Sequence, residues 1–229
     1  MKYYSFNTIT DYIFYLSEII SDCHQKKSRL EKYLGEIDIL IKENPVAKSI
    51  EADLYEEISD KSLRLIQYLS NLIGDNTKWA MSYSRFRKVL ESNKNKLWIS
   101  IKELKKSELD LLHEFNSLRN WWLHIPESLI ISKRNKLILD NNIIELYKHN
   151  ILRVIYKYYE LKYLKELQNE VREFLVSTNS IFLTMITDYD LLIKSKSVIE
   201  FETWNLKPYL LMDIVQDSLN IHNNQNLTK

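Results

Sequence analysis

The residues best suited to chemistry lie together in one short stretch, Ser117 to Glu127. Arg119 and Asn120 stand next to each other, and His124 follows after three further residues. A guanidinium is a permanent cation whose planar fork matches phosphate oxygens. An imidazole, with an ordinary pKa of about 6.5, can give or take a proton at neutral pH. The stretch is therefore suited to reactions at a phosphodiester, with Arg119, His124 and Asn120 as candidate catalytic residues.

Helical periodicity sets Arg119 apart from its neighbours. At about 100° per residue, one apolar stripe faces the core, made of Leu111, Phe115, Leu118 and Trp122. Arg119 falls inside this apolar arc, where a guanidinium is costly unless it is paired or reaches solvent. Three partners are open on this evidence: Glu114, a carboxylate from another helix, or the phosphate of a substrate.

Pro126 is expected to end this helix near His124. Proline has no amide proton, and it pushes the preceding Ile125 out of the helical region. On a regular helix Arg119 and His124 are about 140° apart, so one straight helix does not bring them together. An end at His124 frees its side chain from strict helical direction, and a helix C-terminus also favours a protonated imidazole.

Four further residues are weaker candidates for substrate binding. Trp121 can stack on a base, whereas Trp122 is expected to pack in the core. His113 shares a helix face with Asn120 and His124, and it is either a second titrating group or a solvated histidine. Lys105 and Lys106 are the other two candidates for substrate binding.

Positive charge is concentrated between residues 76 and 106. Nine basic residues stand there against Glu91 and Glu103, namely Lys78, Arg85, Arg87, Lys88, Lys94, Lys96, Lys102, Lys105 and Lys106. The segment is either the solvated face of a helix or a surface that attracts phosphate beside the candidate site.

Composition favours an all-α chain. The 229 residues include only two Gly and three Pro, which are too few for the turns of a sheet-rich fold. The net charge is +1, so the chain as a whole is not a polycation. Cys23 is the single cysteine, which excludes a disulfide framework within one chain and a cysteine-based zinc site. A reducing cytoplasm is the expected compartment.

Several functional classes are disfavoured by what the sequence does not contain. No apolar run reaches the length of a membrane span, and the first residues lack the apolar core of a secretory signal. No glycine-rich phosphate loop is present, which excludes nucleotide hydrolysis of the P-loop kind. We expect no metal and no cofactor, and no membrane partner.

Apolar spacing predicts a multi-helix bundle with long antiparallel helices. The first helix is expected from a cap at Thr8 or Thr10 to Asn44-Pro45. Further helices are expected at 46–73, at 77–92, at 96–105 and from a cap at Ser107 to near His124, with a loop at 92–95. Another helix is expected from 141 past Glu173 to an interruption at 178–180, and a last one at 209–219. The chain is expected to be one all-helical unit with a core at roughly 46–175, a helical extension at 180–219 and a frayed tail at 220–229.

The run from Arg119 to His124 resembles the signature of the HEPN superfamily. That signature is Arg, four to six residues, then His, often with a polar residue directly after the Arg; here the spacing is four and the polar residue is Asn120. One toxin subgroup has Tyr two residues after the His, where this chain has Pro126. The resemblance implies a helical bundle, with the HEPN-like core at 46–175, which dimerises and places two copies of the signature at one cleft.

The resemblance also implies an activity. Many members are metal-independent endoribonucleases in toxin–antitoxin, abortive-infection or CRISPR-linked defence. The RNA 2′-OH would attack the neighbouring phosphorus, His124 would act as base or acid, Arg119 would stabilise the charge, and Asn120 would orient the phosphate or the imidazole. A second copy would supply the opposite proton transfer, and one product would carry a 2′,3′-cyclic phosphate.

Two functions of different classes follow from the sequence. One is a dimeric hydrolase of RNA in a toxin–antitoxin or antiviral defence role, with RNA, a second copy and an antitoxin or defence protein as partners. The other is a non-catalytic helical module that binds RNA or protein, in a regulatory or antitoxin-like role.

Overall fold

The computed structural model describes residues 4–44, 47–99, 101–123, 127, 129–132, 135, 156–200 and 211–226. These residues form an all-α, multi-helix fold with one very small sheet, which confirms the expected fold class. The elements are α1 (Ile9–Glu43), β1 (Ser49–Glu51), α2 (Ala52–Gly74), α3 (Tyr83–Leu97), α4 (Lys106–Leu123), β2 (Tyr158–Glu160), α6 (Leu161–Ile193) and α7 (Leu211–Asn226).

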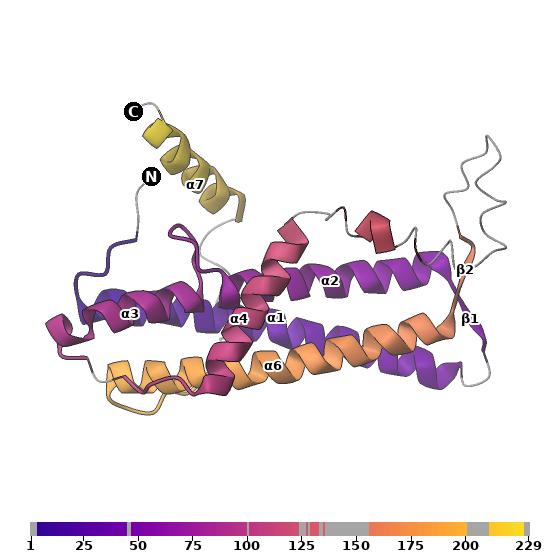
Figure 1. Ribbon diagram of the computed structural model, residues 1–229, viewed down its shortest axis with the longest axis horizontal. Coiled ribbons are helices and arrows are strands. Elements are labelled where there is room, and N and C mark those ends of the chain that lie inside the picture. The colour runs from indigo at the N-terminus through magenta and orange to yellow at the C-terminus, as the bar shows by residue number, and fades with distance from the viewer. Residues whose placement is uncertain are drawn as a thin grey trace.

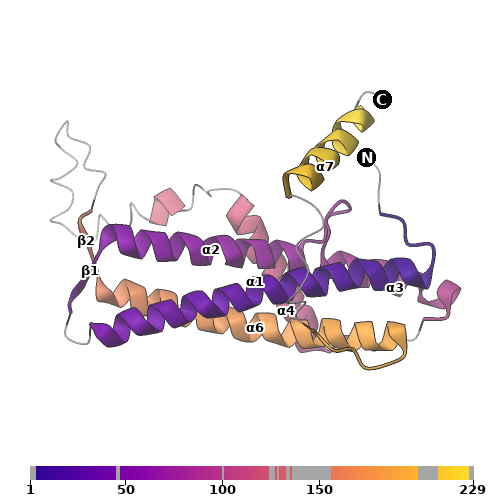
Figure 2. The same ribbon diagram turned by 180° about the vertical axis from the view of Figure 1, so that it is seen from behind.

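Three long helices lie side by side and form the body of the molecule (Figure 1). α2 and α6 run in the same direction and α1 runs against both, as the view from behind also shows (Figure 2). α1 packs most extensively against α6, and the core includes Tyr12, Leu16 and Ile19 of α1. α1 is therefore an integral part of the hydrophobic core, whereas the HEPN-like core at 46–175 stays a prediction.

The first helix forms where its apolar spacing predicts. One face of α1 is buried and includes Tyr12, Leu16 and Ile19. The helix begins after Thr8, whose amide donates to the Asp11 carboxylate at 2.7 Å. That bond and a second one from the Asn7 amide lower the pKa of Asp11, because they stabilise the ionised carboxylate. Asn44 follows the last helical residue, as the sequence indicated.

A two-stranded antiparallel ribbon joins the first residues of α2 and α6. β1 pairs with β2 in the register Ser49 to Glu160 and Glu51 to Tyr158. The first amide of each helix, at Ala52 and Leu161, donates to a carbonyl of the opposite segment, so the ribbon satisfies donors that helices otherwise leave open. The prediction of helix was wrong over residues 47–51 and over residues 158–160.

The region from α3 to α4 differs from the prediction in three places. α3 continues through the predicted loop at 92–95 and ends at Trp98, which has a left-handed backbone (φ 53°) and a 94% exposed side chain. Residues 101–105 are not helical, so no short helix occupies 96–105. Ser107 does not cap α4; the Lys105 amide donates instead to the Glu108 carboxylate at 2.6 Å.

α6 is continuous through the predicted interruption at 178–180. Thr178 is buried within the helix, so a division of the chain between residues 175 and 180 has no structural counterpart. α7 also continues to Asn226, past residue 219 and into the predicted frayed tail. None of the described helices is both long enough and apolar enough to cross a membrane.

A buried ion pair holds α3 against α6. Nη1 of Arg87 lies 2.8 Å from Oδ1 of Asp188, and Nη2 of Arg87 donates to the Lys102 carbonyl at 2.8 Å. The Tyr83 hydroxyl donates to the same carboxylate at 2.6 Å. Burial raises the pKa of Asp188 and of Tyr83, since both charged forms are costly away from water.

We predict that Asp188→Ala lowers the free energy of unfolding by about 3–5 kcal/mol, because it leaves the Arg87 charge buried and unpaired. Urea denaturation measures this loss. Glu57→Ala, which breaks the exposed pair with Lys61, is the control and costs less than about 1 kcal/mol. Arg87→Met combined with Asp188→Leu recovers most of the stability, because no charge remains buried. A loss for Asp188→Ala as small as that of the control would contradict the prediction.

Candidate functional site

The candidate site lies where α4 crosses the end of α2. Gly74, the last residue of α2, is buried, and a Cβ atom placed on it would lie 2.4 Å from the Asn116 nitrogen and 2.5 Å from the Phe115 carbonyl carbon. Only a residue without a side chain allows the two backbones to approach so closely. Figure 1 shows α4 crossing α2 near the end of that helix, and the residue after Gly74 contacts the last turns of α4.

That residue is Asp75, and it forms an ion pair with Arg119. Nη2 of Arg119 lies 2.9 Å from Oδ2 of Asp75, and the two side chains are 17% and 12% exposed. Oδ1 of Asp75 accepts the Thr77 amide at 2.9 Å, which fixes the carboxylate. Of the partners left open for Arg119, the structure shows a carboxylate from another helix, and not Glu114.

Asn120 contacts the same guanidinium from its own helix. Nη1 of Arg119 donates to Oδ1 of Asn120 at 2.8 Å. Because the amide oxygen faces Arg119, the amide nitrogen is turned away from it and remains available as a donor. Asn120 therefore orients Arg119, and its expected contact with a phosphate or an imidazole stays a prediction.

One donor of Arg119 remains without a partner. Nε is buried and has no hydrogen bond within the described part of the chain. A buried donor left in this way costs roughly 1–3 kcal/mol, so its persistence calls for an explanation. Of the five N–H donors of a guanidinium, the contacts to Asp75 and Asn120 use two.

The predicted acid or base, His124, lies outside the described residues, as do Ile125 and Pro126. The description of α4 ends at Leu123, so its predicted end near His124 is not tested. The distance between Arg119 and His124 therefore remains a prediction.

The weaker candidates are not gathered around Arg119. His113 lies six residues earlier on α4, roughly 9 Å along the axis, and Lys105 and Lys106 lie at the beginning of the helix, roughly 20 Å away. Trp121 is 45% exposed and lines a cavity of about 600 Å³ together with Leu63 of α2, Phe174 of α6 and other residues. The structure thus places Arg119 and Asn120 together and leaves the other candidates elsewhere on or before α4.

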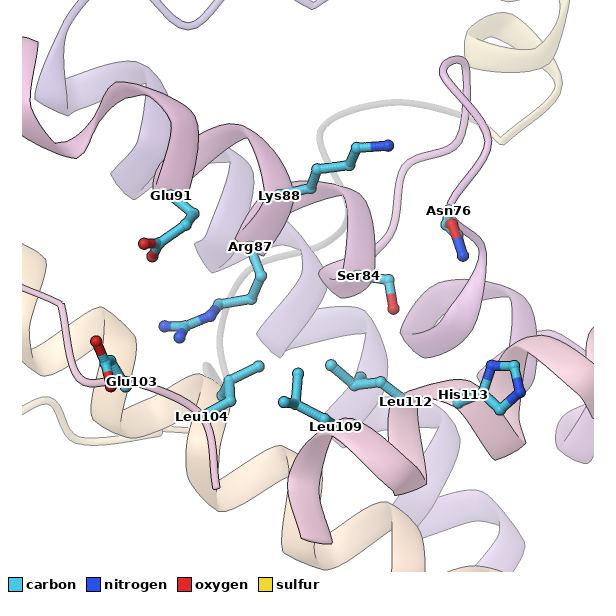
Figure 3. A pocket seen from close by; sticks show the side chains of 10 residues that line it. All are labelled: Asn76, Ser84, Arg87, Lys88, Glu91, Glu103, Leu104, Leu109, Leu112 and His113. Carbon is cyan, nitrogen blue, oxygen red and sulfur yellow. The ribbon is translucent and has the colours of Figure 1, made fainter. Parts of the chain in front are cut away.

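His113 belongs to a separate cavity of about 570 Å³ between α3 and α4 (Figure 3). Ser84, Asn76 and His113 lie at one end of this cavity, and Glu91 and Glu103 lie at the other. Three leucines lie between the two ends, namely Leu104, Leu109 and Leu112.

The basic segment is less positive at its surface than its composition indicates. Arg87 is buried against Asp188, and Lys94 forms an ion pair with Glu91. Arg85 donates to the Ala80 carbonyl at 2.9 Å. The exposed cations include Lys88, Lys96, Lys102, Lys105 and Lys106, so the segment combines structural cations with solvated ones. Among the residues that the structure describes, no three His, Cys, Asp or Glu side chains are grouped as metal ligands.

Sequence reasoning missed Asp75 and the role of Gly74. Gly74-Asp75-Asn76 reads as the end of a helix, and nothing local to it indicates a contact with residue 119. The available signal was on α4, where an arginine inside an apolar arc needed a partner, and a carboxylate from another helix was one of the three left open.

Comparison with known proteins gives partial similarity only. No family model matches the chain, and no solved structure matches it. The chain is similar to proteins described as "Uncharacterized chromosomal cassette SCCmec type IVc protein CR006" from Staphylococcus aureus strain MRSA252 and from Staphylococcus aureus. Each is 34% identical over 97 residues, which cover 40% of this chain and 14% of the relative.

We predict that Gly74→Ala destabilises the protein by about 1–3 kcal/mol or more, because the new methyl group meets the backbone of α4. Gly35→Ala is the matched control: it lies inside α1 with no atom within 4 Å of the new Cβ, and it stabilises by about 0.8–1.0 kcal/mol. Thermal unfolding followed by circular dichroism measures both changes. Equal shifts in the same direction would show that α2 and α4 do not cross closely at Gly74.

Proposed function

We propose that this protein is a metal-independent endoribonuclease of the HEPN type. RNA is its substrate, two copies of the chain compose the site, and Arg119, Asn120 and His124 are its catalytic residues. The observation that carries the proposal is the position of Arg119, held from two sides close to the described end of α4. His124 follows that end directly in the sequence.

The contacts of Arg119 support a role as an electrostatic clamp. A guanidinium already fixed by Asp75 and Asn120 does not have to be ordered when a phosphate arrives, which is the preorganisation that stabilises a developing charge. Asp75 is then a positioning residue that acts through Arg119. The free amide nitrogen of Asn120 is a second donor for the same phosphate.

The reaction needs no group beyond these side chains and the RNA. The 2′-oxygen attacks the neighbouring phosphorus as His124 of one copy removes its proton, and the bond to the 5′-oxygen breaks. His124 of the second copy protonates that oxygen. The products are a 2′,3′-cyclic phosphate and a 5′-hydroxyl. Two copies also remove the difficulty that Arg119 and His124 face different directions on one helix.

A biological setting comes from the resemblance alone. We propose a toxin–antitoxin or anti-phage defence role, in which cleavage of cellular RNA stops growth and a partner protein controls the activity.

The second candidate is a non-catalytic helical module that binds RNA or protein. The ion pair itself favours it, since a carboxylate that satisfies a mostly buried guanidinium is also what a purely structural arginine requires. On this alternative Arg119 contributes to stability, and no cleavage depends on it.

We predict that the purified protein cleaves labelled RNA in the presence of EDTA and leaves 2′,3′-cyclic phosphate ends. Arg119→Lys lowers kcat/KM roughly 10²–10³-fold, because a lysine cannot present a planar fork to two oxygens. His124→Ala lowers it roughly 10²–10⁴-fold through loss of proton transfer. Gel analysis of the fragments, with phosphatase sensitivity of their ends, measures both effects.

A mixture of wild-type and variant chains tests the composite site. If one site uses His124 of both copies, a dimer of one wild-type and one His124→Ala chain lacks one of the two proton-transfer groups. Excess His124→Ala protein is therefore expected to lower the activity of the wild type further than dilution alone does. Wild-type protein that binds RNA but never cuts it would establish the second candidate instead. Cleavage that is equal in the wild type and both variants would reveal a contaminating nuclease and remove the proposal.

A further inference from the structure

We propose that the cavity between α3 and α4 binds a nucleoside phosphate, with the phosphate at the end formed by Ser84, Lys88, Asn76 and His113. The cavity measures about 570 Å³, within the roughly 300–1,000 Å³ of small-molecule sites. It is separate from Arg119, and its residues come from α3, α4 and the segment that follows α2.

The phosphate end is defined by polar side chains without partners. Ser84 and Lys88 are four residues apart on α3 and therefore share one face of the helix. Asn76 and His113 approach from the other two elements (Figure 3). None of these four side chains has a hydrogen bond or ion pair within the described residues. A hydroxyl, an ammonium, an amide and an imidazole thus line one end of the cavity without protein partners, and each can donate a hydrogen bond to a phosphate oxygen.

The rest of the cavity suits a nucleoside. Leu104, Leu109 and Leu112 provide an apolar surface on which a flat base can lie. At the far end Glu103 has no ion-pair partner among the described residues, whereas Glu91 is already paired with Lys94. The Glu103 carboxylate can accept hydrogen bonds from the amino group and ring N–H of guanine. Apolar walls with a few polar groups at defined ends are typical of ligand sites.

The ligand has two possible sources, a free mononucleotide and one unit of an RNA strand. His113 and Asn120 lie seven residues apart on the same face of α4, roughly 10 Å along its axis. A strand whose scissile phosphate reaches Arg119 can therefore place a neighbouring nucleotide in the cavity. This assignment to RNA rests on the proposed function, whereas binding of the nucleoside phosphate does not.

Calorimetric titration with guanosine 5′-monophosphate, guanosine and inorganic phosphate tests the site. Ser84→Ala and Lys88→Gln are expected to weaken binding of the monophosphate at least tenfold and to leave guanosine unaffected. Glu103→Gln weakens both ligands, and Leu109→Trp, which fills the cavity from an exposed position, abolishes both. Lys96→Gln is the matched control, with the same charge change on α3 outside the cavity. Circular dichroism checks that each variant is folded.

The outcomes separate the site from the proposed function. Monophosphate affinity that is the same in Lys88→Gln and Lys96→Gln overturns the site, and so does inorganic phosphate that binds as tightly as the monophosphate. With His124→Ala protein, an RNA trinucleotide that binds at least tenfold tighter than the monophosphate identifies an RNA strand as the ligand. If the variants lose monophosphate binding and the wild type never cuts RNA, the cavity is supported as a binding site and the nuclease is rejected. If the protein cleaves RNA but binds no nucleotide, the nuclease is supported and the cavity is rejected as a binding site.

Discussion

The close crossing of α2 and α4 at Gly74 is the constraint on which the candidate site depends. Without it, the carboxylate of Asp75 and the guanidinium of Arg119 would not meet, because they lie on different helices and 44 positions apart in the chain. The helix crossing and the ion pair support each other. Helix packing places the two charges side by side, and the ion pair lowers the free-energy cost of an arginine in an apolar arc. The helix crossing and the proposed catalytic role therefore draw on the same residues at this point.

Much of the helical framework can be derived from local sequence. The stripe of α1 was predictable because burial on one face leaves apolar residues at spacings of three and four, and Thr8 and Asn44 mark its ends. The ribbon was not predictable in this way, since three-residue strands carry no period and exist only through pairing between residues 49–51 and 158–160. The predicted interruption at Thr178 was wrong because threonine has a low intrinsic helix propensity yet packs well inside a buried helix.

The candidate site was predictable only in part. The types and spacing of Arg119, Asn120 and His124 are the basis of the proposed chemistry, but the partner of a charge depends on how helices pack. Cations in the basic segment illustrate the same limit: Arg87 and Lys88 are neighbours in sequence, yet Arg87 is buried in an ion pair and Lys88 is exposed beside a cavity. Charge counting treats the two residues as equivalent.

The extensive packing of α1 against α6 has a consequence for biosynthesis. A ribosome completes α1 long before it reaches residue 161, so the apolar stripe of α1 emerges without its main partner. Contacts between such distant segments slow folding, and exposed apolar surface promotes aggregation in the meantime. The nascent N-terminal helix is thus a natural client for a chaperone, and a chain truncated before α6 would be a poor candidate for stable expression.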